Sequence, residues 1–175
     1  MEEVKKLCHD CEKEIEVEGE VVDKFEILFK PLPGKEIHLE ALEVNGRTPE
    51  ELLKFPHPSI GLRALKTRLS RYVDKYNPSD KMIVAGYNVA FDADFLRQLY
   101  LSLGDKYYGS WFFSPMLDVY TYVAEAVAKK KLRLPNYKLV TVCKAFNIEA
   151  EGAHDAKVDI EITRQLYYKL KEYLL

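Results

Sequence analysis

The 175-residue chain lacks any long apolar run and any excess of basic charge. No uninterrupted stretch approaches the roughly 20 apolar residues that a membrane-spanning helix requires. The formal net charge is −2, so no global positive field favours tight binding to a nucleic-acid duplex. This charge does not exclude an enzyme that holds a few nucleotides locally, because acidic metal ligands also lower the net charge. With 47% hydrophobic and 31% charged residues, the composition is that of a globular domain rather than a disordered chain.

Cysteine is also scarce, with three residues: Cys8, Cys11 and Cys143. An odd number this small, without a signal peptide at the start of the chain, indicates a reducing compartment, and we expect a cytoplasmic protein. Cys8 and Cys11 form a Cys-x-x-Cys pair. A structural zinc site would need two further ligands at suitable spacing, and none follows nearby. We therefore expect two ordinary thiols in or near a strand.

The length suits one domain, residues 1–175, with a single sizeable core. Glu18-Gly19-Glu20 is typical of a turn between two strands, Glu14–Glu18 and Val21–Lys30, which predicts a β-hairpin. Thr48 is the expected N-cap of a helix that begins at Pro49. Periodicity predicts further elements: a short helical turn at Leu39–Val44, helices at Ser59–Lys75, Asp92–Leu103, Asp118–Lys130, a helix ending near Asn147, and His154–Leu174, and strands at Met82–Tyr87 and Trp111–Phe113. This is an α/β pattern, with a mixed central β-sheet flanked by helices.

Two short stretches contain residues suited to catalysis. Asn88–Leu96 reads N-V-A-F-D-A-D-F-L and places Asp92 just past a buried strand, at the end where α/β sites usually lie. His154–Asp159 reads H-D-A-K-V-D, and these two residues suit one site better if the histidine lies just before the final helix and Asp159 in its second turn. Asn88 is placed either to brace the loop or to touch substrate. Phe91 suits core packing and a surface for base stacking equally well.

These residue types fit the cleavage of nucleic-acid phosphodiesters. The negative charge of a phosphodiester repels a nucleophile, and two divalent cations about 4 Å apart relieve that repulsion. Mg²⁺ and Mn²⁺ prefer oxygen ligands such as the carboxylates of Asp92 and Asp159. His154 can take the proton from water because a histidine pKa lies near neutral pH.

Two other features have simpler explanations. Lys129-Lys130-Lys131 with Arg133 is a basic run that could contact a phosphate backbone, but cations at a helix C-terminus are favourable in any protein. The aromatic-rich stretch Tyr107–Phe113 could stack on bases, although core packing accounts for it better. Asp118 is expected to be a helix N-cap.

The two motifs resemble those of the DEDDh family of 3′→5′ exonucleases, the DnaQ-like nucleases with an RNase H-like fold. The second motif of that family is similar to N-x-x-F-D-x-x-F-L, as in Asn88–Leu96, and its third is similar to H-x-A-x-x-D, as in His154–Asp159. Residues 135–143 resemble the family's segment before the third motif, and residues 19–31 resemble its strand hairpin. The resemblance covers roughly residues 14–172.

The resemblance assigns roles to single residues. It implies that Asp92 and Asp159 are metal ligands and that His154 is the general base that activates water. Asn88, Phe91 and Phe95 occupy positions that support the site or its substrate. The implied cofactors are two Mg²⁺ or Mn²⁺ ions per site. The implied partners are the 3′ ends of single-stranded DNA or RNA, a DNA polymerase or other replication or repair protein, and, as in parts of the family, a second copy of the chain.

The family's first motif, D-x-E on a central apolar strand, has no clear counterpart. Asp10-Cys11-Glu12 is the only D-x-E near the start, and the stretch before it is too charged for a buried strand. Asp10 and Glu12 are therefore either metal ligands or part of a solvated strand edge. In an alternative alignment, residues 6–17 form the second strand and the first is absent.

The sequence thus predicts a metal-dependent 3′→5′ exonuclease that releases nucleoside monophosphates. The alternative is a catalytically silent or truncated module of the same fold that binds nucleic acid or a polymerase. A different two-metal nuclease or phosphatase fits the motif spacing less well.

Overall fold

The computed structural model describes residues 3–5, 10–32, 48–152 and 155–175, and the side chains in these ranges except those of 3–5 and 10–13. Its strands form two sheets. The first is antiparallel, with the order β1 (Glu3–Lys5), β2 (Asp10–Val17) and β3 (Glu20–Leu28). The second is a parallel pair of β4 (Ala85–Gly86) and β5 (Leu117–Asp118). Strand β1 contacts β4, so the two sheets lie side by side.

The β2–β3 hairpin confirms the turn predicted at Glu18-Gly19. Glu18 and Gly19 have φ angles of 53° and 91°, and a tight turn with two such residues matches the twist of its flanking strands. A bulge follows Ile15, where the register shifts. Side chains alternate along β2, so Ile15 is in the core while Glu14 and Glu16 belong to the other face of the sheet.

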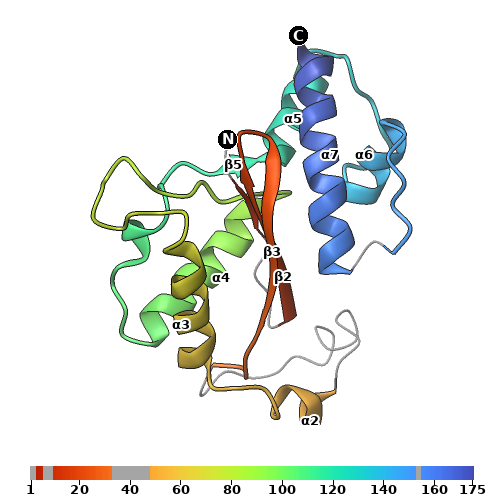
Figure 1. Ribbon diagram of the computed structural model, residues 1–175. Coiled ribbons are helices and arrows are strands. Elements are labelled where there is room, and N and C mark those ends of the chain that lie inside the picture. The colour runs from red at the N-terminus through yellow and green to blue at the C-terminus, as the bar shows by residue number, and fades with distance from the viewer. Residues whose placement is uncertain (1–2, 6–9, 33–47, 153–154) are drawn as a thin grey trace.

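Helices cover both sides of the β2–β3 hairpin (Figure 1). Helices α3 and α4 lie on one side, and α5, α6 and α7 lie on the other. Helix α2 is a short turn that precedes α3. The bounds are α2 Pro49–Leu52, α3 Pro58–Leu69, α4 Val89–Ser102, α5 Val119–Ala128, α6 Leu139–Ala145 and α7 Ala156–Leu174. The α/β class and the flanking helices agree with the sequence-based prediction.

Short-range hydrogen bonds determine where α2 begins and where α3 ends. Thr48 caps α2 as expected, and Glu51 completes a reciprocal capping box. Helix α3 ends at Leu69, several residues before the predicted end at Lys75. The Ser70 hydroxyl donates to the Thr67 carbonyl at 2.9 Å, and the chain then turns. Val73 still packs into the core from this turn, which explains why apolar spacing alone extended the predicted helix.

Each helical layer has its own hydrophobic core. The first core joins the hairpin to α3, α4 and the run toward β4, and it includes Ile15, Phe29, Leu65, Leu69, Val84, Leu96, Tyr100 and Phe112. The second joins α5, α6 and α7, and it includes Val119, Val123, Val142, Cys143, Ile148, Leu166 and Leu170. A small third cluster, Ala85 and Ile160 with Leu117 against them, connects α7 to β4 and β5.

The predicted strands Met82–Tyr87 and Trp111–Phe113 are only partly formed. Met82 makes an isolated parallel bridge with Phe112, and regular pairing resumes only at Ala85. Between these points Ser114–Met116 is exposed, and Pro115 has no N–H to donate to a ladder. The predicted strand Met82–Tyr87 is therefore extended, but only Ala85–Gly86 within it forms a regular strand.

The predicted helical turn at Leu39–Val44 lies outside the described residues. Within the ranges that the structure describes, no helix is long and apolar enough to cross a membrane.

We predict that Gly61→Ala destabilises the fold because α3 approaches β3 closely at this point. An added Cβ would lie 2.7 Å from Cδ1 of Phe29, whose side chain is fully buried. Overpacking of this kind costs about 1–3 kcal/mol and exceeds the gain in helix propensity. Denaturant unfolding should show a lower free energy for Gly61→Ala. Gly109→Ala is the control, since nothing lies within 4 Å of its added Cβ, and an equal loss there would contradict the explanation.

Candidate active site

The start of α4 is held by the carboxylate of Asp118. Strand β4 ends at Gly86, which pairs in register with Asp118 at the end of β5. Asn88 has a left-handed backbone, with φ at 60°, and its N–H donates to Asp118 Oδ1 at 2.8 Å. The same oxygen accepts from the N–H of Tyr120 at 3.0 Å and so caps α5, as predicted. One carboxylate therefore fixes the first residues of two helices.

Asp92 lies in the first turn of α4, immediately beyond this anchored loop. Its side chain is only 5% exposed, which is unusual for a carboxylate. The N-terminus of a helix is electropositive and stabilises a negative charge there. Burial beside a helix start keeps Asp92 in one position at the carboxyl end of β4.

Asp159 lies in the first turn of α7, because the helix begins at Ala156 rather than at the predicted residue 154. Asp155 caps the helix by accepting from Lys157 N–H at 2.9 Å, and the Asp159 N–H donates to the Asp155 carbonyl at 2.9 Å. The next residue, Ile160, packs against Ala85 of β4. Helices α4 and α7 thus both begin beside β4, and each carries one predicted metal ligand in its first turn.

Buried titratable side chains lie between the start of α7 and the β4–β5 end. Burial, with a contribution from the charge of Asp159, raises the pKa of the Cys143 thiol to about 12. Burial also raises the pKa of Tyr87 well above its usual range, and Tyr120, Cys143 and Asp118 add to the shift. Tyr87 thus keeps its proton and donates it to the carbonyl of Tyr137, which ties the segment before α6 to the loop after β4.

The remaining predicted residues of the second motif divide between surface and core. Asn88 is exposed, and Phe91 is 70% exposed on the first turn of α4. Phe95 is half-buried against the first core. The exposure of Phe91 favours the stacking interpretation over core packing. His154 lies outside the described residues.

The structure places Asp10 and Glu12 at the start of β2, where their register partners on β3 are Leu28 and Glu26. This agrees with the alternative alignment in placing residues 10–17 on the second strand, but the first strand is not absent as that alignment supposed, because β1 (Glu3–Lys5) pairs with β2. The strand on the other side of β2 is β1, Glu3-Val4-Lys5, which carries no D-x-E. Among the residues that the structure describes, no three His, Cys, Asp or Glu side chains are grouped to hold a metal ion.

Sequence reasoning missed the bond between Asp118 and Asn88. The cap on α5 was visible as an acid at a strand–helix junction, but the second bond joins residues 30 positions apart. No local pattern reports such a contact, which depends on the parallel pairing of β4 with β5.

Comparison with known proteins relates this chain to a family of nucleases. The RNase T exonuclease family model matches residues 11–167. A PolC-type DNA polymerase III from Thermotoga maritima is 27% identical over 156 residues, which are 89% of this chain and 10% of the polymerase.

Two solved structures are similar in fold. E. coli exonuclease I in complex with a dT13 oligonucleotide has a TM-score of 0.68 and 18% identity, over 92% of this chain and 36% of that protein. The nuclease domain of 3′hExo, a DEDDh family member bound to rAMP, has a TM-score of 0.67 and 11% identity, over 97% of this chain and 90% of that domain. The family match over residues 11–167 includes both motifs and most of the chain, which therefore belongs to the exonuclease family and has its DEDDh-type, RNase H-like fold.

Proposed function

We propose that this chain is a metal-dependent 3′→5′ exonuclease that acts on single-stranded DNA or RNA ends and releases nucleoside monophosphates. The observation that carries the proposal is the meeting of two acidic helix starts at one strand end. Asp92 is buried in the first turn of α4, and Asp159 lies in the first turn of α7. The residue after Asp159, Ile160, packs against Ala85 of β4. The 3′hExo nuclease domain bound to rAMP and exonuclease I bound to dT13 support this choice of substrate and product.

Asp92 and Asp159 fit Mg²⁺ or Mn²⁺ in the chemistry of their donors, since both offer carboxylate oxygens and one of them is held rigidly by burial. Two such ions, held by these carboxylates, would supply a polarised water and positive charge for the leaving oxygen. His154 would act as the general base that accepts the proton of the attacking water. Exposed Phe91 offers a ring face to the terminal base, and Asn88 holds the loop beside it.

A catalytically silent module is the second candidate. Two carboxylates alone hold a divalent ion weakly, and the family's first acidic motif has no clear counterpart in the sequence. A silent module would retain the fold and bind nucleic acid or a polymerase without cleaving. The similarity to part of a PolC-type polymerase supports a replication partner in either case.

A labelled-substrate time course tests the exonuclease proposal. We expect a 5′-labelled single-stranded oligonucleotide to shorten from its 3′ end with Mn²⁺ or Mg²⁺, and EDTA to stop the reaction. Asp92→Asn and Asp159→Asn should each slow the rate on the order of 100-fold or more, and His154→Asn should slow it similarly. No ladder at all would reject catalysis and favour the silent module, and a ladder that persists in Asp92→Asn would reject the site built on Asp92.

Single substitutions can identify the third carboxylate. The candidates are Asp10 and Glu12 from the sequence, and Glu3, which the structure places on β1 in register with Ile15. We expect one of Asp10→Asn, Glu12→Gln and Glu3→Gln to weaken Mn²⁺ binding in calorimetry and to abolish cleavage, whereas exposed Glu149→Gln changes neither. If all three variants bind Mn²⁺ and cleave like the unmodified protein, the ligand comes from none of these positions.

Asp118 should act as a positioning residue for α4. Asp118→Ala removes the acceptor for two backbone N–H groups, which costs about 1–2 kcal/mol, and it should lower kcat/KM several-fold by loosening the turn before Asp92. Asp118→Asn keeps an acceptor oxygen and should retain most of the rate. Equal kcat/KM for Asp118→Ala and the unmodified protein, measured well below the unfolding temperature, would show that the cap is only structural.

A further inference from the structure

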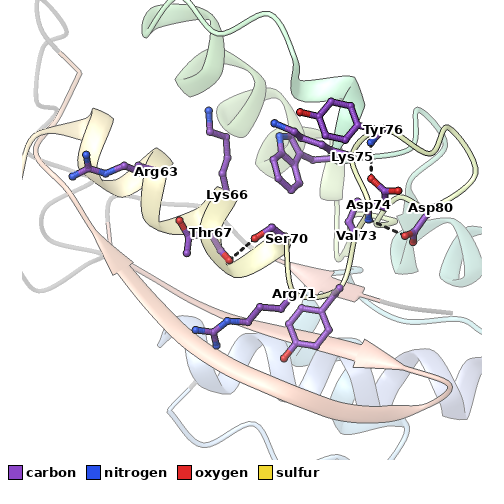
Figure 2. Close-up of a pocket in the computed structure, with 12 residues that line it drawn as sticks. Arg63, Lys66, Thr67, Ser70, Arg71, Val73, Asp74, Lys75, Tyr76 and Asp80 are labelled. Carbon is purple, nitrogen blue, oxygen red and sulfur yellow. Dashed lines mark hydrogen bonds between the residues drawn. The ribbon is translucent and has the colours of Figure 1, made fainter.

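A basic hollow of about 710 Å³ lies at the end of α3 (Figure 2). Its walls come from the second half of α3, the loop that follows it and one buried indole. The lining residues are Arg63, Lys66, Thr67, Ser70, Arg71, Tyr72, Val73, Asp74, Lys75, Tyr76, Asp80 and Trp111.

One face of α3 supplies the first wall. Arg63, Lys66, Thr67 and Ser70 are spaced three, four and seven residues apart, which puts them on the same side of a helix. Figure 2 shows these side chains in a row along α3, with Lys75 and Tyr76 beyond its end. A row of this kind presents polar donors and positive charge along a line rather than at a point.

The positive charges of the basic hollow are mostly uncompensated. Lys66 pairs with Asp105 at 2.7 Å, and this contact helps lower the pKa of Asp105 despite its partial burial. Arg63 and Arg71 are exposed, and neither has a carboxylate within ion-pair distance among the described residues. In a chain whose net charge is −2, such a cluster is a local patch of positive potential.

The two acids in the hollow shape its loop. Asp74 Oδ1 accepts from the N–H of Tyr76 at 3.0 Å, and Asp80 Oδ2 accepts from the N–H of Asp74 at 2.8 Å. These hydrogen bonds hold the loop in a turn that leaves the Tyr76 side chain exposed to solvent. The four cationic side chains of the lining still outnumber its two carboxylates.

An aromatic ring stands free beside the cations. Tyr76 is 84% exposed, so burial does not explain its position. The Lys75 ammonium lies 4.9 Å from the centroid of the Tyr76 ring and 5.9 Å from that of Trp111. An exposed ring beside a lysine ammonium, in the same hollow as two exposed arginines, matches a surface that stacks a base and contacts phosphates along the strand.

The hollow and the candidate active site lie at opposite ends of the same extended run. Trp111 accepts from the N–H of Met82, at the beginning of the run, whereas Asp92 follows its end at Gly86. Four residues of extended chain span about 13 Å. The basic hollow is therefore a separate surface and not part of the catalytic edge.

We propose that the basic hollow binds the body of a single-stranded nucleic acid, with Arg63 and Arg71 on phosphates and Tyr76 stacked on a base. This inference rests on the proposed function for its substrate class. It adds a second contact, apart from the 3′ end, that holds the strand without reading its sequence. A protein partner with an acidic surface is the competing occupant.

Binding without cleavage tests the proposal. We would measure fluorescence anisotropy of labelled single-stranded DNA and RNA of about 20 nucleotides, with EDTA present, over a range of salt concentrations. Arg63→Ala/Arg71→Ala should weaken binding at least about fivefold and reduce the slope of log K against log salt by roughly 1.4, since each lost phosphate contact on a single strand contributes about 0.7. Tyr76→Ala should weaken binding about fivefold or more without changing the slope.

The matched control is Lys54→Ala/Lys144→Ala, which also removes two exposed positive charges and should leave affinity and slope unchanged. Unchanged binding of Arg63→Ala/Arg71→Ala, or no binding by the unmodified protein, would overturn the proposal. So would poly-glutamate that binds with the same dependence on the arginines while Tyr76→Ala has no effect, because that result indicates an acidic protein partner.

The binding measurement and the cleavage time course together separate this inference from the exonuclease proposal. Arginine-dependent and Tyr76-dependent binding without any 3′ ladder would retain the hollow and reject catalysis. A metal-dependent ladder with arginine-independent binding would do the reverse.

Discussion

The parallel pairing of β4 with β5 determines where the candidate site lies. Because Gly86 and Asp118 are in register, the Asp118 carboxylate reaches the first residues of both α4 and α5. The third connection is Ile160, which packs α7 onto Ala85 and Leu117. Three helix starts therefore depend on two pairs of residues, and the electropositive ends of α4 and α7 face the region where Asp92 and Asp159 lie.

The packing of α7 on the sheet relies on charge as well as on apolar contact. Glu14 and Glu16 of β2 are only 5% and 4% exposed on the face that α7 covers. Burying a carboxylate costs several kcal/mol unless partners compensate. Here Lys24 pairs with Glu14, the Arg164 guanidinium lies 3.9 Å from it, and the Tyr168 hydroxyl donates to Glu16. Since α7 also carries Asp159, these partners help to fix the position of one candidate metal ligand.

The sequence predicts the elements that local punctuation marks. Thr48-Pro49 and Glu18-Gly19 fix a cap and a turn through short-range bonds, and the two motifs point to Asp92 and Asp159 at helix starts. Features that depend on contacts between distant segments could not be predicted from the sequence. Alternation along β2 is typical of a strand with one solvated face, yet α7 covers that face. The sequence shows a basic run at residues 129–133, whereas the basic hollow joins residues 63–80 to Trp111, and only the fold brings that indole beside them.

The proposed binding of single-stranded nucleic acid and the proposed cleavage of its 3′ end depend on different parts of this fold. The candidate catalytic edge needs oxygen donors beyond Asp92 and Asp159, and β1, the strand beside β2, offers only Glu3. The basic hollow rests on Leu65, Leu69 and Val73 of the first core and on buried Trp111. Its geometry does not require a completed metal site. A single-stranded nucleic acid can therefore bind in the basic hollow whether or not its 3′ end is cleaved. A substitution that removes catalysis need not remove this binding.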